Sequence, residues 1–272
     1  MIVADLHTHT RCSHGKNTAR EMFAAGRERG IVLHGFSEHS PRPDGYDYPL
    51  EYRAQLVRDF PDHVREVLEL KEQYPGQVLL GMEVDWMEAE SDFIQQTLRA
   101  YDFDYLIGSV HFLGAWGYDF CADDWKELSF ERRAEHYADY FRALSGMAAS
   151  RLFHIAAHPD LIKIFSLDSF RQWLTRHDGL DLVRACLVAI RDAGVSMEIS
   201  SAGLRKPCRE IYPGPEIMRL AADLRVPVVF GSDAHQTAEM GFAFDELARY
   251  AASFGIERGE CSFGGATHVF SL

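Results

Sequence analysis

Short apolar runs alternate with longer amphipathic segments along almost the whole chain. The runs are rich in Val, Ile and Phe and are often preceded by Gly or Pro. Runs of this kind suit strands that are buried on both faces of a parallel sheet. There are seven of them: Ile2–Ala4, Ile31–Phe36, Val78–Leu80, Tyr105–Val110, Phe153–Ala157, Val195–Ile199 and Val226–Phe230.

The segments between these runs carry apolar residues at helical spacing. Thr18–Arg29 is predicted to form a helix with Thr18 as its N-cap and Gly30 just past its end. Pro61 is expected to end or kink the segment Tyr52–Tyr74, which is therefore predicted to form two helices. The other predicted helices are Ser91–Ala100, Phe130–Ala149, Leu180–Ala193, Pro215–Leu224 and Ala238–Phe254.

Strand–helix alternation of this kind implies βα units. Seven such units in a chain of 272 residues favour a closed or nearly closed α/β barrel over an open sheet. The chain has no low-complexity tract, no linker rich in Gly, Ser or Pro and no repeat at the residue level. The sequence therefore predicts a single barrel domain over residues 1–272.

Composition narrows the class of protein. Hydrophobic residues make up 47% of the chain, which is sufficient for a sizeable core. The formal net charge of −13 disfavours nucleic acid as the main partner, because phosphate backbones are bound by clustered Lys and Arg. We expect no signal peptide and no membrane-spanning segment. The five cysteines are scattered and form no CxxC pair, which indicates reduced thiols in a cytoplasmic protein.

Groups that can bind metal or phosphate follow every one of the seven runs. In order, they are Asp5, His7 and His9; Glu38 and His39; Glu83 and Asp85; His111; His158; Ser200, Ser201 and Arg205; and Asp233 and His235. The C-terminal ends of the strands form the face of a βα barrel on which active sites are built. We therefore expect these side chains to meet at one site.

A single histidine at a strand end is more often a satisfied polar residue than a metal ligand. Two observations favour ligation here. His7 and His9 alternate in an extended segment, so both imidazoles can reach one ion. A buried cluster of so many ionisable groups would also be costly without cations to balance it. The remaining histidines are interpreted as structural, with His63, His136 and His177 on helix surfaces and His154 as one rival ligand.

The mixed nitrogen and oxygen ligands suit Zn, Mn or Fe, whereas Ca or Mg alone would not attract so many imidazoles. The set is too large for one tetrahedral ion, so two or three ions are implied. Glu83 is the carboxylate that could bridge two of them.

Seven motifs taken together resemble the polymerase-and-histidinol-phosphatase (PHP) family. They are DLHTHT, FSEHS, GMEVDW, GSVHF, AAHPDL, SSAGLRKP and GSDAH. The resemblance implies a distorted (β/α)7 barrel, similar to a TIM barrel, with a trinuclear metal centre. By motif position, it assigns His7, His9, Glu83 and Asp233 to the first ion; Glu83, His111 and His158 to the second; and His14, His39 and His235 to the third.

GSVHF followed by Trp116-Gly117-Tyr118-Asp119, and SSAGLRKP, look most like the histidinol-phosphate phosphatases of this family. The resemblance thus implies hydrolysis of L-histidinol phosphate, a small phosphorylated substrate. It makes Arg205 the phosphate-binding arginine, while Lys206 is expected to point elsewhere.

The chemistry follows from this arrangement. Two cations bridged by a carboxylate acidify the water between them, and the resulting hydroxide can attack phosphorus in line. Arg205 would neutralise charge on the phosphoryl oxygens through its bidentate fork. Asp233, His235 and Arg205 are the expected catalytic residues. The proton donor to the leaving group stays open between His235 and a metal-bound water.

The predicted substrate contacts are Arg205, His39, Asp85 and Asp119. Asp85 and Asp119 could equally support the metal ligands, and Asp44 is interpreted as part of a loop turn. Two other functions remain open: a PHP-type phosphoesterase acting on another monoester or on nucleotides, and a non-catalytic metal-binding protein. The sequence indicates no oligomeric state.

Overall fold

A computed structural model describes residues 2–46 and 50–272. Its centre is a seven-stranded sheet in the order β1-β2-β3-β4-β7-β8-β9, in which every neighbouring pair is parallel. The strands are β1 (Ala4–Asp5), β2 (Leu33–Phe36), β3 (Val78–Asp85), β4 (Tyr105–Ser109), β7 (Ile155–Ala156), β8 (Ser196–Ser200) and β9 (Val228–Gly231). Each of the seven predicted strands is therefore confirmed.

The first and last strands of the sheet meet just beyond their C-terminal ends. Thr8 and Ala234 form a parallel bridge, and the backbone N–H of His9 donates to the carbonyl of Ala234 at 2.8 Å. The carboxylate of Asp5 accepts hydrogen bonds from the backbone and the hydroxyl of Ser232. The sheet is thus a nearly closed α/β barrel, as the alternation of runs predicts.

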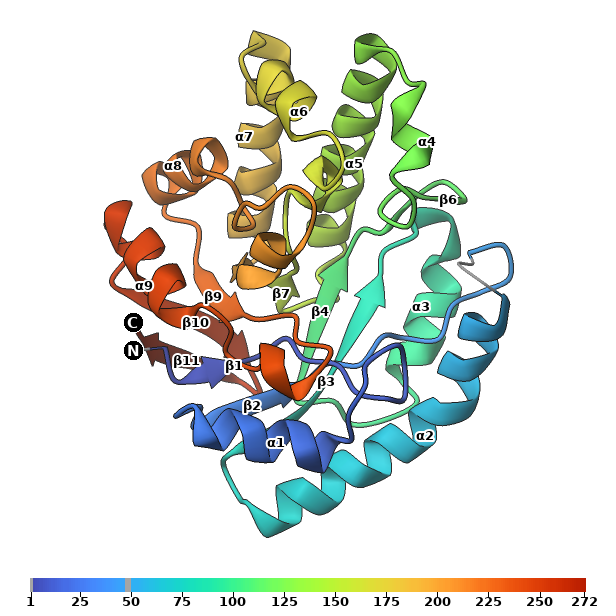
Figure 1. Ribbon diagram of the computed structural model, residues 1–272, viewed down its shortest axis with the longest axis vertical. Coiled ribbons are helices and arrows are strands. Elements are labelled where there is room, and N and C mark those ends of the chain that lie inside the picture. Colours follow the sequence, from blue (N-terminus) through green and yellow to red (C-terminus); the bar gives the residue numbers. More distant parts are fainter. Residues whose placement is uncertain (1, 47–49) are drawn as a thin grey trace.

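The helices surround the strands, as Figure 1 shows. They are α1 (Ala19–Glu28), α2 (Leu50–Gln73), α3 (Ser91–Leu98), α4 (Asp123–Lys126), α5 (Phe130–Ser150), α6 (Leu167–Leu174), α7 (His177–Asp192), α8 (Pro215–Leu224) and α9 (Phe244–Ser253). Among the residues described, no helix is long and apolar enough to cross a membrane.

Three features of the helices show where the local sequence predicts the structure and where it does not. Thr18 caps α1 in a reciprocal capping box with Glu21, as predicted from the sequence. The expected break at Pro61 is wrong, because α2 continues through this residue. Pro61 lies on the exposed face of the helix, where the carbonyl freed by the missing N–H can turn toward water. Helix α9 starts six residues later than predicted, after Ala243 in the left-handed region.

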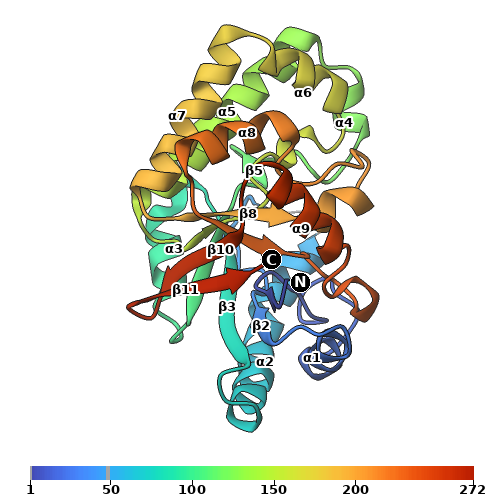
Figure 2. The same ribbon diagram turned by 90° about the vertical axis from the view of Figure 1, so that its left-hand side faces the viewer.

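Two antiparallel hairpins lie outside the predicted βα pattern. The short one joins β5 (Phe112–Leu113) to β6 (Trp116–Gly117), beside the C-terminal ends of the strands. The longer one joins β10 (Arg258–Phe263) to β11 (Ala266–Ser271) and lies at the other end of the barrel (Figure 2). A hydrogen bond from the Ser196 hydroxyl to the Glu260 carbonyl ties it to the N-terminal start of β8.

The hydrophobic core has two parts. The larger part lies between the sheet and the surrounding helices. The smaller part fills the barrel interior, where residues of β1, β4, β7 and β9 pack against Cys261, Phe263 and Phe270 of the C-terminal hairpin. The hairpin therefore closes the end of the barrel at which the strands begin, and the polar groups gather at the opposite end.

Candidate metal centre

Glu83, near the end of β3, lies at the middle of the polar cluster and faces histidines on two sides. Its Oε2 is 3.3 Å from Nε2 of both His7 and His9 and 2.9 Å from Nδ1 of His39. Its Oε1 is 3.1 Å from Nε2 of His158 and 3.7 Å from Nε2 of His111. The two oxygens of one carboxylate thus face two different groups of imidazoles.

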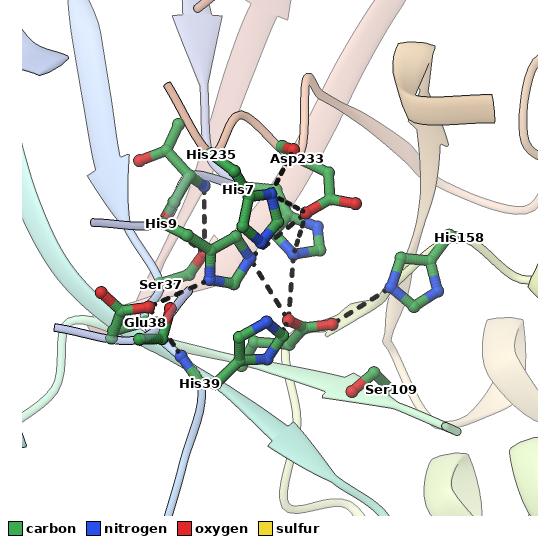
Figure 3. Close-up of polar contacts among 12 residues, drawn as sticks. His7, His9, Ser37, Glu38, His39, Ser109, His158, Asp233 and His235 are labelled. Carbon is green, nitrogen blue, oxygen red and sulfur yellow. Dashed lines mark hydrogen bonds and ion pairs between the residues drawn. The ribbon is translucent and has the colours of Figure 1, made fainter. Parts of the chain in front are cut away.

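Asp233, two residues beyond β9, approaches the same cluster from the end of the last strand of the sheet. Its Oδ1 lies 3.3 Å from Nε2 of His9 and 3.7 Å from Nε2 of His7. Its backbone has a φ of 49°, a left-handed conformation that turns the chain sharply after the strand. Figure 3 shows Asp233 and His235 converging on His7 and His9 from this turn.

Four imidazoles form a stack along one side of the cluster. The ring centroids are 4.1 Å apart for His9 and His39, 4.3 Å for His9 and His235, and 4.0 Å for His14 and His235. His14 is exposed, and its Nδ1 lies 2.9 Å from the hydroxyl of Tyr52. The structure thus brings together every residue that the sequence predicts as a metal ligand, with His14 at the solvent side.

Three buried carboxylates support histidines of the cluster from behind. Each lies against the Nδ1 atom, so that Nε2 faces the centre. The pairs are Glu198 with His7 at 2.8 Å, Glu38 with His9 at 3.3 Å, and Asp85 with His111 at 2.5 Å. Figure 3 shows the Glu38–His9 contact. Carboxylates in this position fix the tautomer and orientation of metal-binding histidines.

Sequence reasoning did not identify the contribution of Glu198. It lies in β8, inside a run that reads as an ordinary buried strand. A signal was nevertheless present, because a lone glutamate among apolar neighbours of a buried strand requires a polar or charged partner.

Neighbouring charges strongly shift the pKa values of the histidines and carboxylates in the cluster. Burial raises the pKa of Glu83, but the surrounding histidines, His7 first among them, hold it well below its usual range. Burial opposes protonation of His9, yet the adjacent carboxylates raise its pKa to about 9. Burial and the neighbouring His9 lower the pKa of His39 to about 3. The carboxylates therefore remain ionised and favour positive charge among the imidazoles.

The chemistry of this donor set fits metal ions. Within the described residues, Nε2 of His7, His9 and His235 and Oε2 of Glu83 are buried without a hydrogen-bond partner. Two atoms that bind one tetrahedral zinc at 2.0–2.1 Å lie about 3.3 Å apart. The Nε2 atoms of His7 and His9 lie 3.3–3.7 Å from carboxylate oxygens of Glu83 and Asp233. Three groups have potential ligand atoms within 4.8 Å of one another: His7, His9 and Asp233; His7, Glu83 and His158; and His9, His39 and His235.

A cavity of about 380 Å³ opens beside the cluster. It is lined by His14, His39, Arg42, Tyr52, Glu83, His111, Asp119, Phe120, His158, Leu161, Lys206, Asp233 and His235. Of the predicted substrate contacts, His39 and Asp119 are among these residues. Asp85 is buried away from the cavity between His111 and Arg42, to which it bonds at 2.5 Å.

The two cations of the Leu204-Arg205-Lys206 segment separate. Arg205 donates to the backbone carbonyls of Ser232 and Asp233 at 2.8 and 3.0 Å. The expectation that Lys206 points elsewhere is not met, since Lys206 lines the cavity. The 3-10 turn Ser201–Arg205 ends at this point and the backbone becomes extended, which sends the two side chains in different directions.

The histidines outside the cluster have other environments. His63 is fully buried beside Glu38 and Thr10, so its interpretation as a surface residue is wrong. It lies on the inner face of α2, and the polar residues around it in the sequence cover the outer face. His154 accepts a hydrogen bond from the backbone of Leu106 at the start of the strands, far from the potential ligands.

Fold and site together define an α/β barrel with a histidine–carboxylate centre at the C-terminal ends of its strands. The PHP domain family model matches residues 5–202, and the chain belongs to this family. The distorted, TIM-like barrel that the resemblance implied is therefore the fold observed.

Similar proteins are known from several organisms. The chain is 35% identical over 257 residues to a probable histidinol-phosphatase of Deinococcus radiodurans, which covers 91% of this chain and 92% of the relative. It is 31% identical over 265 residues to histidinol-phosphatase of Bacillus subtilis, which covers 89% of this chain and 96% of the relative. Histidinol phosphate phosphatase of Lactococcus lactis, solved with zinc, L-histidinol and phosphate, shares the fold with a TM-score of 0.75, at 17% identity over 97% of this chain and 98% of that one.

Proposed function

We propose that this protein is a metal-dependent phosphomonoesterase that hydrolyses L-histidinol phosphate to L-histidinol and phosphate. The observation that carries the proposal is the arrangement around Glu83, whose two oxygens face two groups of imidazoles beside a cavity of about 380 Å³. The relatives that share 31% and 35% of their residues with this chain are named as histidinol-phosphatases, which supports this substrate.

The proposed cofactors are two or three Zn, Mn or Fe ions. His7, His9, Glu83 and Asp233 would hold one ion, Glu83, His111 and His158 a second, and His14, His39 and His235 a third. Such ions lower the pKa of water toward neutrality and withdraw charge from phosphoryl oxygens. Glu83 is suited to join two ions, because its carboxylate oxygens face different histidines.

His235 is better placed to bind metal than to protonate the leaving alcohol. Its Nδ1 lies 3.0 Å from the carbonyl of Asp233, an acceptor, so Nδ1 carries the proton and Nε2 presents a lone pair. Burial lowers the pKa of His235 well below its ordinary value, and the nearby His9 adds to this effect. Both observations favour a neutral imidazole that serves as a ligand.

Lys206 is proposed to bind the phosphate directly, and Arg205 is proposed to act on it from outside the residues that line the cavity. Lys206 lines the cavity and can pair directly with a bound anion. Arg205 holds the turn that carries Asp233, and its Nη1 is buried without a hydrogen-bond partner among the described residues. Asp119, which lines the cavity and is partly exposed, is proposed to contact the ammonium or imidazole group of the alcohol.

Residues 1–272 are proposed to act as one PHP-type barrel domain in the cytoplasm. The family match ends at residue 202, yet Asp233 and His235 lie beyond it and face the same centre. The segment that follows β9 is therefore part of the same functional unit.

The decisive experiment compares substrates on protein loaded with metal. Hydrolysis of L-histidinol phosphate should exceed that of other small phosphomonoesters and of a nucleotide phosphodiester. No preference for L-histidinol phosphate would contradict the assigned substrate, and no hydrolysis of any ester would favour a non-catalytic metal-binding protein. Elemental analysis should find two or three ions per chain, and fewer than two in active protein would refute the multinuclear centre.

A further inference from the structure

Glu198 connects two separate parts of the metal centre. It lies in β8 (Ser196–Ser200) and is almost completely buried. Its Oε1 is 2.8 Å from Nδ1 of His7, which follows β1. Its Oε2 accepts a hydrogen bond of 2.8 Å from the backbone N–H of His158, which follows β7. One carboxylate therefore reaches both residues.

The contact with His7 decides which ring nitrogen carries the proton. An ionised carboxylate can only accept hydrogen bonds, so Nδ1 of a neutral His7 must be the protonated nitrogen. The lone pair is then on Nε2, which faces Oε2 of Glu83 at 3.3 Å and Oδ1 of Asp233 at 3.7 Å. This is the tautomer that a metal ion at the centre requires.

The contact with His158 acts on the backbone. His158 has a φ of 24°, an unfavourable value for a residue with a side chain. The hydrogen bond to Glu198 holds this conformation, and a second one runs from the hydroxyl of Tyr140 to the carbonyl of His158 at 3.0 Å. In this conformation Nε2 of His158 lies 3.1 Å from Oε1 of Glu83.

The neighbouring strand leaves room for this carboxylate. A Cβ atom placed on Gly231 of β9 would lie only 1.9 Å from Oε1 of Glu198 and 2.8 Å from Cβ of His7. Even alanine at this position would displace the carboxylate from His7. The absence of a side chain at Gly231 is thus part of the same arrangement.

We propose that Glu198 is a positioning residue that fixes the ligand-ready tautomer of His7 and the backbone of His158 at the same time. It thereby sets one ligand on each side of Glu83. The inference rests on the metal centre proposed above, but its first consequence, the protonation site of His7, can be measured without substrate and without turnover.

The substitution Glu198→Gln tests this inference with almost no change in shape. The backbone N–H of His158 must donate, so the amide oxygen will turn toward His158. The amide NH₂ then faces Nδ1 of His7 as a donor and disfavours the neutral tautomer that carries its proton on Nδ1, which is the tautomer that can bind metal through Nε2. Long-range ¹H–¹⁵N spectra of histidine-labelled, zinc-loaded protein should show the Nδ1–H of His7 hydrogen-bonded to the carboxylate in the wild type, and this signal should be shifted or lost in the variant.

Metal binding supplies the second measurement. Zn²⁺ titration against a chelating indicator should show affinity reduced about 10–100-fold in Glu198→Gln, the range typical of losing a residue that orients a ligand. An unchanged Nδ1–H signal of zinc-bound His7, or zinc affinity within twofold of the wild type, would overturn the proposal. If the wild type binds zinc but does not hydrolyse L-histidinol phosphate, the proposed function fails while this inference stands.

Two further variants separate positioning from general destabilisation. Gly231→Ala should weaken zinc binding as well, although it removes no polar group. Met197→Ala, at the next position of β8, opens a cavity in the core behind the sheet. It should lower the melting temperature while leaving the His7 tautomer and zinc affinity unchanged. Loss of zinc affinity in Met197→Ala equal to that in Glu198→Gln would count against a specific role of Glu198.

Discussion

Nδ1 of His111 lies 2.5 Å from a carboxylate oxygen of Asp85, and both side chains are buried. The second oxygen of Asp85 accepts from Nε of Arg42. Asp85 thus has the same relation to His111 that Glu198 has to His7. It supports a proposed ligand and does not reach the cavity.

Asp85→Asn is expected to reduce metal affinity about 10–100-fold through the loss of this support. The KM for L-histidinol phosphate, measured with saturating metal, should stay near the wild-type value, because Asp85 does not line the cavity. Metal titration combined with steady-state kinetics checks both. A raised KM at full metal content would instead make Asp85 a substrate contact.

Arg205→Ala and Lys206→Ala should have different effects. Lys206 lines the cavity, so its loss should raise the KM for substrate and the inhibition constant for inorganic phosphate, both roughly tenfold for one lost ionic contact. Arg205 donates to the carbonyls of Ser232 and Asp233, so its loss should also disturb the turn that carries Asp233.

Elemental analysis of the two variants distinguishes the roles. Full metal content with weakened phosphate inhibition identifies a direct phosphate contact. Reduced metal content in Arg205→Ala alone would show that Arg205 acts by holding Asp233. Reduced metal content in Lys206→Ala would contradict a role of Lys206 that is limited to phosphate binding.

Lys163 is a fully buried cation outside the metal centre. Its Nζ donates to Asp160 at 2.7 Å, to Glu210 at 2.8 Å and to the carbonyl of Ile211 at 3.0 Å. Lys163→Met should lower the free energy of unfolding by about 3–5 kcal/mol, because it leaves the buried carboxylate of Asp160 without its counter-charge. Urea denaturation at constant pH and metal concentration measures the change.

The exposed side of this network provides the control. Arg171 pairs with the other oxygen of Glu210 but is largely in solvent. Arg171→Met should cost no more than about 1 kcal/mol. The double variant Lys163→Met with Asp160→Asn should recover part of the loss, and equal effects of the two single variants would contradict the importance of burial.

His34 is expected to make the protein sensitive to mild acid. It is buried in β2 against Phe23, and burial lowers its pKa from 6.5 to about 4. Between these values the unfolded chain binds a proton that the folded protein does not, so stability falls as the pH drops from about 6.5 to about 4. The full contribution is about 3 kcal/mol.

The substitution His34→Asn removes this titration. The difference in unfolding free energy between pH 7.5 and pH 5 should be smaller in the variant than in the wild type, with both proteins stripped of metal. The same pH dependence in both would exclude His34 as a source of the acid sensitivity.

The spacing of apolar residues and the positions of Gly and Pro predict most of the barrel. The seven runs of Val, Ile and Phe mark the strands because a strand buried on both faces needs apolar residues throughout. Pro61 misleads because the effect of proline depends on whether its helix face meets solvent, which local sequence does not reveal. The hairpin β10–β11 carries a Gly264-Gly265 turn signal, but it falls outside the repeating βα pattern, which therefore does not predict it.

The site was predictable where a residue type allows few other roles. A histidine or carboxylate directly after a buried strand belongs to the active face of a barrel, as His7 and Glu83 show. Supporting residues such as Glu198 depend on contacts between distant strands, which no local pattern encodes. The different surroundings of Arg205 and Lys206 depend on one change of backbone angle at the end of a 3-10 turn.

The position of the proposed metal ions at the junction between β1 and β9 also affects the stability of the fold. Asp5 and Ser232 bond across 227 positions of the chain, and His7, His9 and Asp233 converge beside that bond. An ion held by these three ligands would cross-link the beginning and the end of the barrel, much as a disulfide would. Closing so long a loop is costly in chain entropy. The metal centre would then also stabilise the closed barrel, and it could form only after the last strand of the sheet has docked.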